Sequence, residues 1–369
     1  MDIEPIHPGT PPVGISAAAL WLPGGVSKVS EAVEHRRIRA RTARELGHEA
    51  LPCADDVAAP DMAVHAARQA LAAAGEPAAA LDVVCHAWMY HQGHDLWSAP
   101  HYVARALGAA AALPFGMQQV CNGGAMGLDT VAAQLLHRGA RPGPGKGQGQ
   151  GLGLVTTGDR FVEPGFDRWA ADYGVAYGDA GTAVLLRTPA GPRDPLLLRA
   201  VATAAAPGLE EMHRGADPLS DAARTLRDRV DMRATKRAYL KEHGDEPFRT
   251  ANERCVREVV AGALHEAGLA ADDPRIRCVV LPRFGLKTLE EGWRPVLADC
   301  VAAPAVDLGR DTGHLGAGDA TASIAELVRD RVLAPGEYAL VLSAGAGFTW
   351  SCLAVEATRA AGLTKETQR

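Results

Sequence analysis

A helix followed by two strands occurs twice in this sequence, and this repeat limits the folds that the chain can adopt. The first copy begins at Cys121, where small residues lead into an apolar helix, and the second begins near Asp319. In both copies the helix is followed by two apolar segments that are typical of strands. The sequence therefore predicts an α/β protein with two related halves, residues 1–190 and 191–369.

Composition and charge indicate which partners and which location to expect. The 369 residues are 47% hydrophobic, which is enough to bury a large core, and the net charge is −6. Acidic and basic residues are interspersed, so we expect no nucleic-acid partner and no polybasic contact with a membrane. The first residues lack the layout of a signal peptide, and no apolar run reaches the length of a membrane-spanning helix. These features predict a cytoplasmic protein.

Cys121 stands at the start of the first repeated helix. A thiol in this position meets unpaired backbone N–H groups and the positive end of the helix dipole, which favour its thiolate form. Gly123 and Gly124 allow another backbone or a substrate to come close. The alternative is a small core residue, because free cysteines are among the most buried residue types.

Other motifs indicate sites less strongly. The seven cysteines include no Cys-x-x-Cys pair, which argues against a disulfide framework or a structural zinc site. His91, His94 and Asp95 lack a further set of ligands at metal-binding spacing, so we expect no metal. The glycine-rich insert at 140–151 follows no strand, so we expect a surface loop and not a dinucleotide site.

Two charged segments each have two interpretations. The arginines between positions 36 and 44 form either a solvated helix face or a docking surface for a phosphate-bearing or acidic partner. The segment 209–248 is either a lid over an acceptor site or an excursion on the surface.

His314 lies in a glycine-rich turn, five residues before Asp319. Catalysis by a cysteine nucleophile needs a base near the sulfur and a group that orients the base. An aspartate that accepts from one imidazole nitrogen fixes the tautomer, although Asp319 also fits the N-cap of its own helix. The turn at Ala346 supplies an N–H group that, with that of Cys121, would form an oxyanion hole. Together, these groups predict acyl transfer through Cys121, His314 and Asp319.

Four motifs, taken in order and spacing, resemble the β-ketoacyl-acyl-carrier-protein synthase III family. They are Cys121-Asn122-Gly123-Gly124, Tyr177-Gly178-Asp179-Ala180-Gly181, Gly318-Asp319-Ala320-Thr321-Ala322-Ser323-Ile324 and Gly345-Ala346-Gly347-Phe348-Thr349-Trp350. The resemblance implies the thiolase fold, a duplicated five-layer αβαβα architecture, and a homodimer. It also implies an acyl-cysteine intermediate and a tunnel for the phosphopantetheine arm of an acyl carrier protein or of coenzyme A, with no bound cofactor.

The chain also departs from this family. Members that form carbon–carbon bonds carry a His-Gln-Ala-Asn motif and a later asparagine, where this chain has Pro282-Arg283-Phe284-Gly285 and Asp319. A carboxylate would repel the enolate that decarboxylation produces. The His314–Asp319 spacing, with the segments 91–97 and 158–169, is instead similar to a branch that moves acyl groups onto oxygen, nitrogen or sulfur in antibiotic biosynthesis.

We therefore expect an acyltransferase of secondary metabolism, in polyketide or antibiotic biosynthesis. Cys121 would take an acyl group from a carrier-protein or coenzyme A thioester, and His314, oriented by Asp319, would activate a hydroxyl, amine or thiol acceptor. A decarboxylating β-ketoacyl synthase, an acyl shuttle between carrier proteins, and a catalytically silent docking module are the alternatives.

Overall fold

The computed structural model of the protein describes residues 12–139, 150–222 and 225–362. Most of the glycine-rich insert expected at 140–151 therefore lies outside the described residues. None of the helices described is long and apolar enough to cross a membrane.

Ten strands of the described residues form one mixed sheet, and each half of the sequence supplies five of them. The first half supplies β1 (Val13–Trp21), β4 (Val83–Ala87), β5 (Leu113–Met117), β6 (Gly151–Asp159) and β7 (Ala180–Thr188). The second half supplies β8 (Leu196–Ala205), β9 (Ile276–Val280), β10 (Ala305–Val306), β11 (Tyr338–Gly345) and β12 (Thr349–Ala357). The strand order is β10-β9-β11-β12-β8-β1-β7-β6-β4-β5, so the two halves occupy opposite ends of the sheet.

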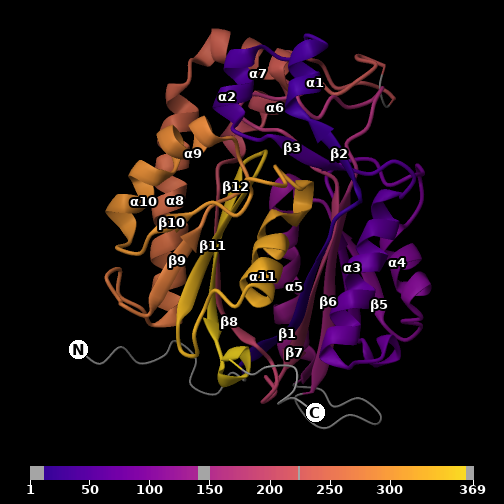
Figure 1. The fold of residues 1–369 in the computed structure, drawn as a ribbon, viewed down its shortest axis with the longest axis vertical. Coiled ribbons are helices and arrows are strands. Elements are labelled where there is room, and N and C mark those ends of the chain that lie inside the picture. The colour runs from indigo at the N-terminus through magenta and orange to yellow at the C-terminus, as the bar shows by residue number, and fades with distance from the viewer. Residues whose placement is uncertain (1–11, 140–149, 223–224, 363–369) are drawn as a thin grey trace.

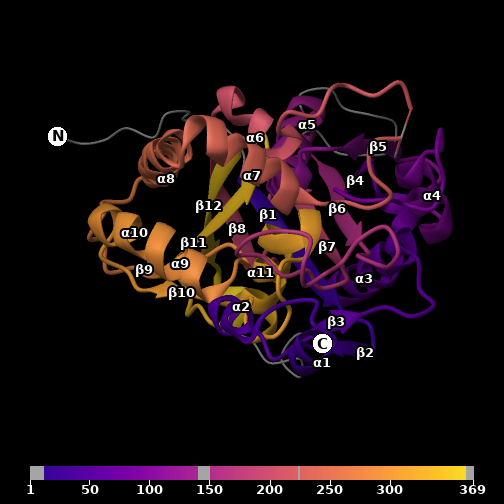
Figure 2. The same ribbon diagram turned by 90° about the horizontal axis from the view of Figure 1, so that it is seen from above.

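The two halves of the sheet meet only where β1 pairs with β8, over Val13 to Ile15. Beyond this short contact they separate, and two helices, α5 (Gly123–Gly139) and α11 (Asp319–Arg329), lie between them (Figures 1 and 2). One apolar cluster joins these two helices to both halves of the sheet. Because helices cover both of its faces, a strand such as β11 is buried along its whole length.

Helices also cover the two outer faces. On the first half these are α3 (Ala59–Ala74) and α4 (Ala99–Leu107), and on the second α8 (Glu246–Ala267), α9 (Leu286–Gly292) and α10 (Arg294–Cys300). Helix α3 turns an apolar stripe that includes Met62, Val64, Ala67 and Leu71 to the sheet, and ends at Gly75 in the left-handed conformation. The result is the five-layer αβαβα architecture that the sequence predicts.

Short elements cover one end of the layers (Figure 1). They are α1 (Val29–Glu34), α2 (Ala40–Leu46), α6 (Glu211–Arg214), α7 (Met232–His243) and the hairpin of β2 (Gly25–Lys28) and β3 (Ala50–Cys53). The sequence pattern suggests helical structure over 217–241, but α7 begins only at Met232. The single helix expected over 286–296 is broken at Trp293 into α9 and α10.

Candidate active site

Cys121 lies in a short 3-10 turn, η2 (Val120–Asn122), that leads directly into α5. The preceding residue, Val120, has a φ of 48°, which is a strained conformation for a β-branched side chain. Such strain is typical of sites where the surrounding fold holds a functional residue in place. The thiol is partly exposed to an internal cavity, and its Sγ lies 3.8 Å from Met89 Sδ.

His314 and Asp319 form a buried pair, as the sequence predicts. The Nδ1 atom of His314 lies 2.7 Å from Oδ2 of Asp319, and both side chains are almost fully buried. The carboxylate of Asp319 also accepts hydrogen bonds from the backbone N–H groups of Leu315, at 2.8 Å, and Arg283, at 3.0 Å. Asp319 is therefore fixed from three sides and orients the imidazole.

The other imidazole nitrogen of His314 is available for chemistry. Its Nε2 atom is buried and has no hydrogen-bond partner of ordinary geometry among the described residues. Burial alone would lower the pKa of His314, but the charges of Asp319 and of Cys121 raise it well above its ordinary value. Because the charge of Cys121 is among the causes that raise the pKa of His314, the sulfur lies near the imidazole.

The turn that carries Ala346 packs directly against the turn that carries Cys121. A Cβ atom added to Gly345 would lie 2.7 Å from the backbone nitrogen of Asn122 and 2.8 Å from the carbonyl oxygen of Gln119. Only glycine allows this approach. Ala346 and Cys121 consequently line the same part of the cavity, where an oxyanion hole is expected.

A cavity of about 490 Å³ is lined by Cys121, His314 and Ala346, and otherwise mainly by apolar and aromatic side chains. Its aromatic lining comprises Tyr173, Tyr177, Phe248, Phe284, Trp293, Phe348 and Trp350. Its volume is in the range of small-molecule binding sites. Three polar residues of the lining, Asp172, His213 and Lys236, are not identified by the sequence patterns, because they lie in segments without a recognisable motif.

The segment 282–285 supplies no polar side chain to the catalytic groups. Arg283 is fully buried and turns away from the cavity, where it pairs with Glu326 and donates to Leu308 O at 3.0 Å and Thr312 Oγ1 at 2.6 Å. Phe284 does line the cavity, and its ring centre is 5.7 Å from that of His314. An aromatic ring therefore lies beside His314, and the guanidinium group of Arg283 has a structural role.

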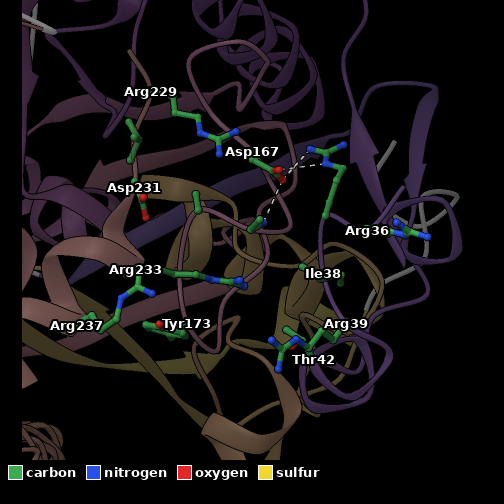
Figure 3. A pocket seen from close by; sticks show the side chains of 14 residues that line it. Arg36, Ile38, Arg39, Thr42, Asp167, Tyr173, Arg229, Asp231, Arg233 and Arg237 are labelled. Atoms are coloured by element: carbon green, nitrogen blue, oxygen red, sulfur yellow. Dashed lines mark hydrogen bonds and ion pairs between the residues drawn. The ribbon is translucent and has the colours of Figure 1, made fainter. Parts of the chain in front are cut away.

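A second cavity, of about 530 Å³, adjoins the first and is rich in arginine (Figure 3). Arg36 and Arg39 lie on one side of it, and Arg233 and Arg237 lie on the opposite side (Figure 3). Tyr173 belongs to the lining of both cavities. The arginine-rich cavity therefore lies next to the one that holds Cys121.

Among the residues with described positions, no three His, Cys, Asp or Glu side chains are arranged to hold a metal ion. The ring of His94 packs instead against Trp97, with ring centres 5.6 Å apart.

Comparisons with known proteins identify the family. Residues 264–357 match the family model for the C-terminal part of 3-oxoacyl-[acyl-carrier-protein] synthase III. A search of curated protein sequences finds no match. The solved structure of ChlB3, described as an acyltransferase, is 32% identical over 95% of this chain and 99% of its own, with a TM-score of 0.82.

Two further solved structures share the fold. The 3-oxoacyl-[acyl-carrier-protein] synthase III of Aquifex aeolicus VF5 is 19% identical, with a TM-score of 0.71 over 93% of this chain and 99% of its own. That of Pseudomonas aeruginosa PAO1 is 21% identical, with a TM-score of 0.71 over 94% of this chain and 98% of its own. By its fold, and by its identity to ChlB3 over almost the whole length of both chains, this protein belongs to the β-ketoacyl-acyl-carrier-protein synthase III family of thiolase-fold enzymes.

Proposed function

We propose that this protein is an acyltransferase that loads an acyl group onto Cys121 and passes it to a hydroxyl, amine or thiol acceptor in polyketide or antibiotic biosynthesis. The observation that carries the proposal is the buried His314–Asp319 pair beside Cys121. The 32% identity to ChlB3, described as an acyltransferase, supports it. So does Phe284, because an apolar ring beside the base cannot stabilise the enolate of a decarboxylation.

In the loading step, the Cys121 thiolate attacks the carbonyl carbon of a thioester. The negative charge that develops on the carbonyl oxygen would be held by the backbone N–H groups of Cys121 and Ala346. The bond to the leaving sulfur then breaks, and the imidazolium of His314 gives its proton to the departing thiolate. The products are an acylated Cys121, a free thiol and a neutral His314.

In the transfer step, neutral His314 takes the proton of the acceptor as the acceptor attacks the acyl carbon. Asp319 stabilises the imidazolium that forms, because it lies 2.7 Å from Nδ1. The bond from the acyl carbon to Cys121 Sγ breaks, and the enzyme returns to its thiolate–imidazolium form. Such a cycle releases no carbon dioxide, which distinguishes it from decarboxylative condensation.

The arginine-rich cavity supports a phosphate-bearing acyl donor, a carrier protein or coenzyme A. Arg36, Arg39, Arg229 and Arg237 have no ion-pair partner within the part of the chain that the structure describes. Guanidinium groups of this kind match the geometry of phosphate oxygens. Since Tyr173 also lines the cavity of Cys121, a donor held at these arginines would lie beside the cavity that contains the sulfur.

We also propose that the protein acts as a cytoplasmic homodimer. Strand β5 lies at one edge of the sheet, and the Leu113 side chain at its start is 47% exposed. Leu96 and Trp97, in the segment that precedes α4, are also exposed, and α4 packs against β5. An unpaired edge with apolar side chains around it fits a contact between two copies of this chain.

The loading step can be tested by intact-protein mass spectrometry after incubation with a panel of acyl thioesters. We expect an adduct of the acyl mass on the wild type and none on Cys121→Ala. Cys300→Ala is the matched control, because Cys300 is also a free, partly exposed cysteine but lies in α10, outside the cavity lining. An adduct that persists in Cys121→Ala would refute the assignment of the nucleophile.

A further inference from the structure

Helix α7 separates the two cavities and presents a different face to each. Met232, Lys236 and Leu240, spaced four residues apart, line the cavity of Cys121. Arg233 and Arg237 line the arginine-rich cavity on the other side. The segment 209–248 therefore forms a wall of the catalytic cavity, and Lys236 brings an ammonium group into an otherwise mostly apolar lining.

Lys236 is held by a buried aspartate. Its Nζ lies 2.5 Å from Oδ1 of Asp172, whose side chain is 4% exposed against 15% for that of Lys236. Asp172 also accepts hydrogen bonds from the hydroxyl of Tyr177, at 3.1 Å, and from the backbone N–H of Tyr173, at 2.7 Å. The carboxylate is satisfied, but the ammonium group has three donors and makes this one hydrogen bond within the described part of the chain.

His213 adds a second unsatisfied group to the same wall. Its ring packs against Phe348 with ring centres 5.1 Å apart, and its Nδ1 is buried without a hydrogen-bond partner among the residues that the structure describes. Burial, and then the charge of Lys236, lower the pKa of His213 to about 4, partly opposed by Asp172. At neutral pH the imidazole is therefore uncharged, and it is able to donate or to accept a hydrogen bond.

Stability alone does not explain these groups. A buried ion pair stabilises a fold little or not at all relative to apolar residues of similar size. Buried polar atoms without partners are costly, and in a binding site they are satisfied by the ligand. Donors on Lys236 and the Nδ1 of His213 both belong to the wall of a cavity that also contains the nucleophile.

The chemistry of the lining indicates what the ligand is. Seven aromatic side chains are part of the lining, which favours a planar aromatic group. The charges of Lys236 and Asp172 cancel, so the cluster attracts a neutral polar group better than a carboxylate. Phe348 contacts His213 and follows Ala346 by only two residues. A single aromatic side chain therefore lies between His213 and the expected oxyanion hole.

We propose that Lys236 and His213 form a recognition site for the hydroxyl group of a hydroxylated aromatic acyl group carried on Cys121. Lys236 donates to the hydroxyl oxygen, and His213 Nδ1 accepts the hydroxyl proton. This inference rests on the proposed acyl transfer through Cys121 and defines the class of acyl group that the enzyme selects.

The test compares loading rates of wild-type enzyme with N-acetylcysteamine thioesters of benzoate, the three hydroxybenzoates and isophthalate (3-carboxybenzoyl). We expect kcat/KM for at least one hydroxybenzoyl isomer to exceed that for benzoyl by about tenfold or more, because buried polar groups stay unpaired with benzoyl. Lys236→Met keeps the length of the side chain and removes its donors. It should bring the ratio of the two rates to about one while benzoyl is still loaded.

His213→Phe is the second variant, since it keeps the ring against Phe348 and leaves the Lys236–Asp172 pair intact. It should also reduce the preference for the hydroxylated acyl group, even if Lys236→Met fails to fold. Lys241→Met is the matched control, because Lys241 lies on the same helix but is exposed to solvent. It should keep the wild-type preference.

The outcomes separate the two proposals. Equal loading of benzoyl and all hydroxybenzoyl probes, or a preference that survives in both Lys236→Met and His213→Phe, would overturn the recognition site and leave the acyltransferase in place. Faster loading of the carboxybenzoyl probe than of any hydroxybenzoyl probe would also overturn it. A wild-type enzyme that forms no adduct on Cys121 with any probe or any carrier-bound thioester would refute both.

Discussion

Asp319 shows how one carboxylate can give a histidine its function. Its two oxygens accept from His314 Nδ1 and from the backbone N–H groups of Leu315 and Arg283, so the imidazole has one orientation and one tautomer. The carboxylate also carries the charge that stabilises the imidazolium. In the proposed transfer step, where His314 would gain a proton from a neutral acceptor, this charge would matter most.

We therefore expect Asp319→Asn to slow transfer more than loading. Transfer should fall by about 10²-fold or more, because the amide neither fixes the tautomer nor stabilises the positive charge. Single-turnover measurements can follow the formation and decay of the acyl-enzyme separately. Asp311→Asn, in the same loop but exposed, is the control. Equal slowing of the two steps would contradict this division of roles.

The sequence indicates the residues of the candidate site but not how the side chains around them are directed. Arg283 marks a departure from the family pattern, yet its sequence position does not reveal that the backbone N–H holds Asp319 while the side chain pairs with Glu326. Motifs identify residue types at a spacing, whereas side-chain direction depends on long-range packing. The same limit hid Lys236 and His213, which come from a segment without a repeat or a glycine turn.

At the level of elements, the active site depends on the contact between α5 and the 3-10 turn η4 (Gly316–Gly318) that precedes α11. Gly124 makes this contact, since a Cβ atom on it would lie 2.5 Å from the carbonyl oxygen of Ala317. Because the contacted oxygen belongs to the backbone, η4 itself would have to shift to make room for a Cβ atom. His314 lies just before η4. A methyl group at position 124 would thus push the half that carries His314 away from Cys121.

We expect Gly124→Ala to reduce acyl loading by at least about tenfold, because displacements near 1 Å at a catalytic group already cost large rate factors. Circular dichroism should still report a folded protein. Gly208→Ala is the control, since a Cβ atom at Gly208 has nothing within 4 Å. Wild-type loading by a folded Gly124→Ala enzyme would show that this contact does not set the distance between the catalytic groups.

Most of the helices and strands follow from sequence periodicity, and the exceptions have physical causes. β1, α3, β6 and the final hairpin of β11 and β12 agree with the pattern to within about two residues. The described residues of the charged stretch before α7, 217–222 and 225–231, are not helical, because propensity alone does not stabilise a helix without an apolar face to bury. The start of α7 is set by packing, so the local sequence pattern does not predict it.

At the scale of the whole molecule, the duplication explains why the site is divided between the halves. Cys121 precedes the central helix of the first half, and Asp319 begins that of the second. These helices lie side by side between the two parts of the sheet, so their N-terminal ends meet (Figure 1). The repeated unit in the sequence predicts the duplication of an α/β unit, and the family resemblance implies the five layers.

Buried histidines in different layers make the stability of the molecule depend on pH. His86, in β4, is fully buried between Thr156 and Gln92, and burial lowers its pKa to about 4, as for His213. The unfolded chain takes up these two protons near pH 6.5, so stability falls as the pH drops from about 6.5 to 4. His314, whose pKa is raised, has the opposite effect. Its contribution to stability is complete below pH 6.5 and is lost as the pH rises.

Between about pH 4 and 6.5, Asp159 has the opposite effect on stability to the two histidines. Burial raises its pKa to about 7, so the folded protein keeps a proton that the unfolded chain releases above about pH 4.

A variant that removes one histidine isolates the contribution of that histidine to the pH dependence of stability. Denaturant unfolding between pH 4 and 6.5 should show that His86→Gln loses less stability on acidification than the wild type, by about 3 kcal/mol, the equivalent of one proton over this window. Parallel pH profiles for the two proteins would mean that His86 is protonated in the fold as readily as in the unfolded chain.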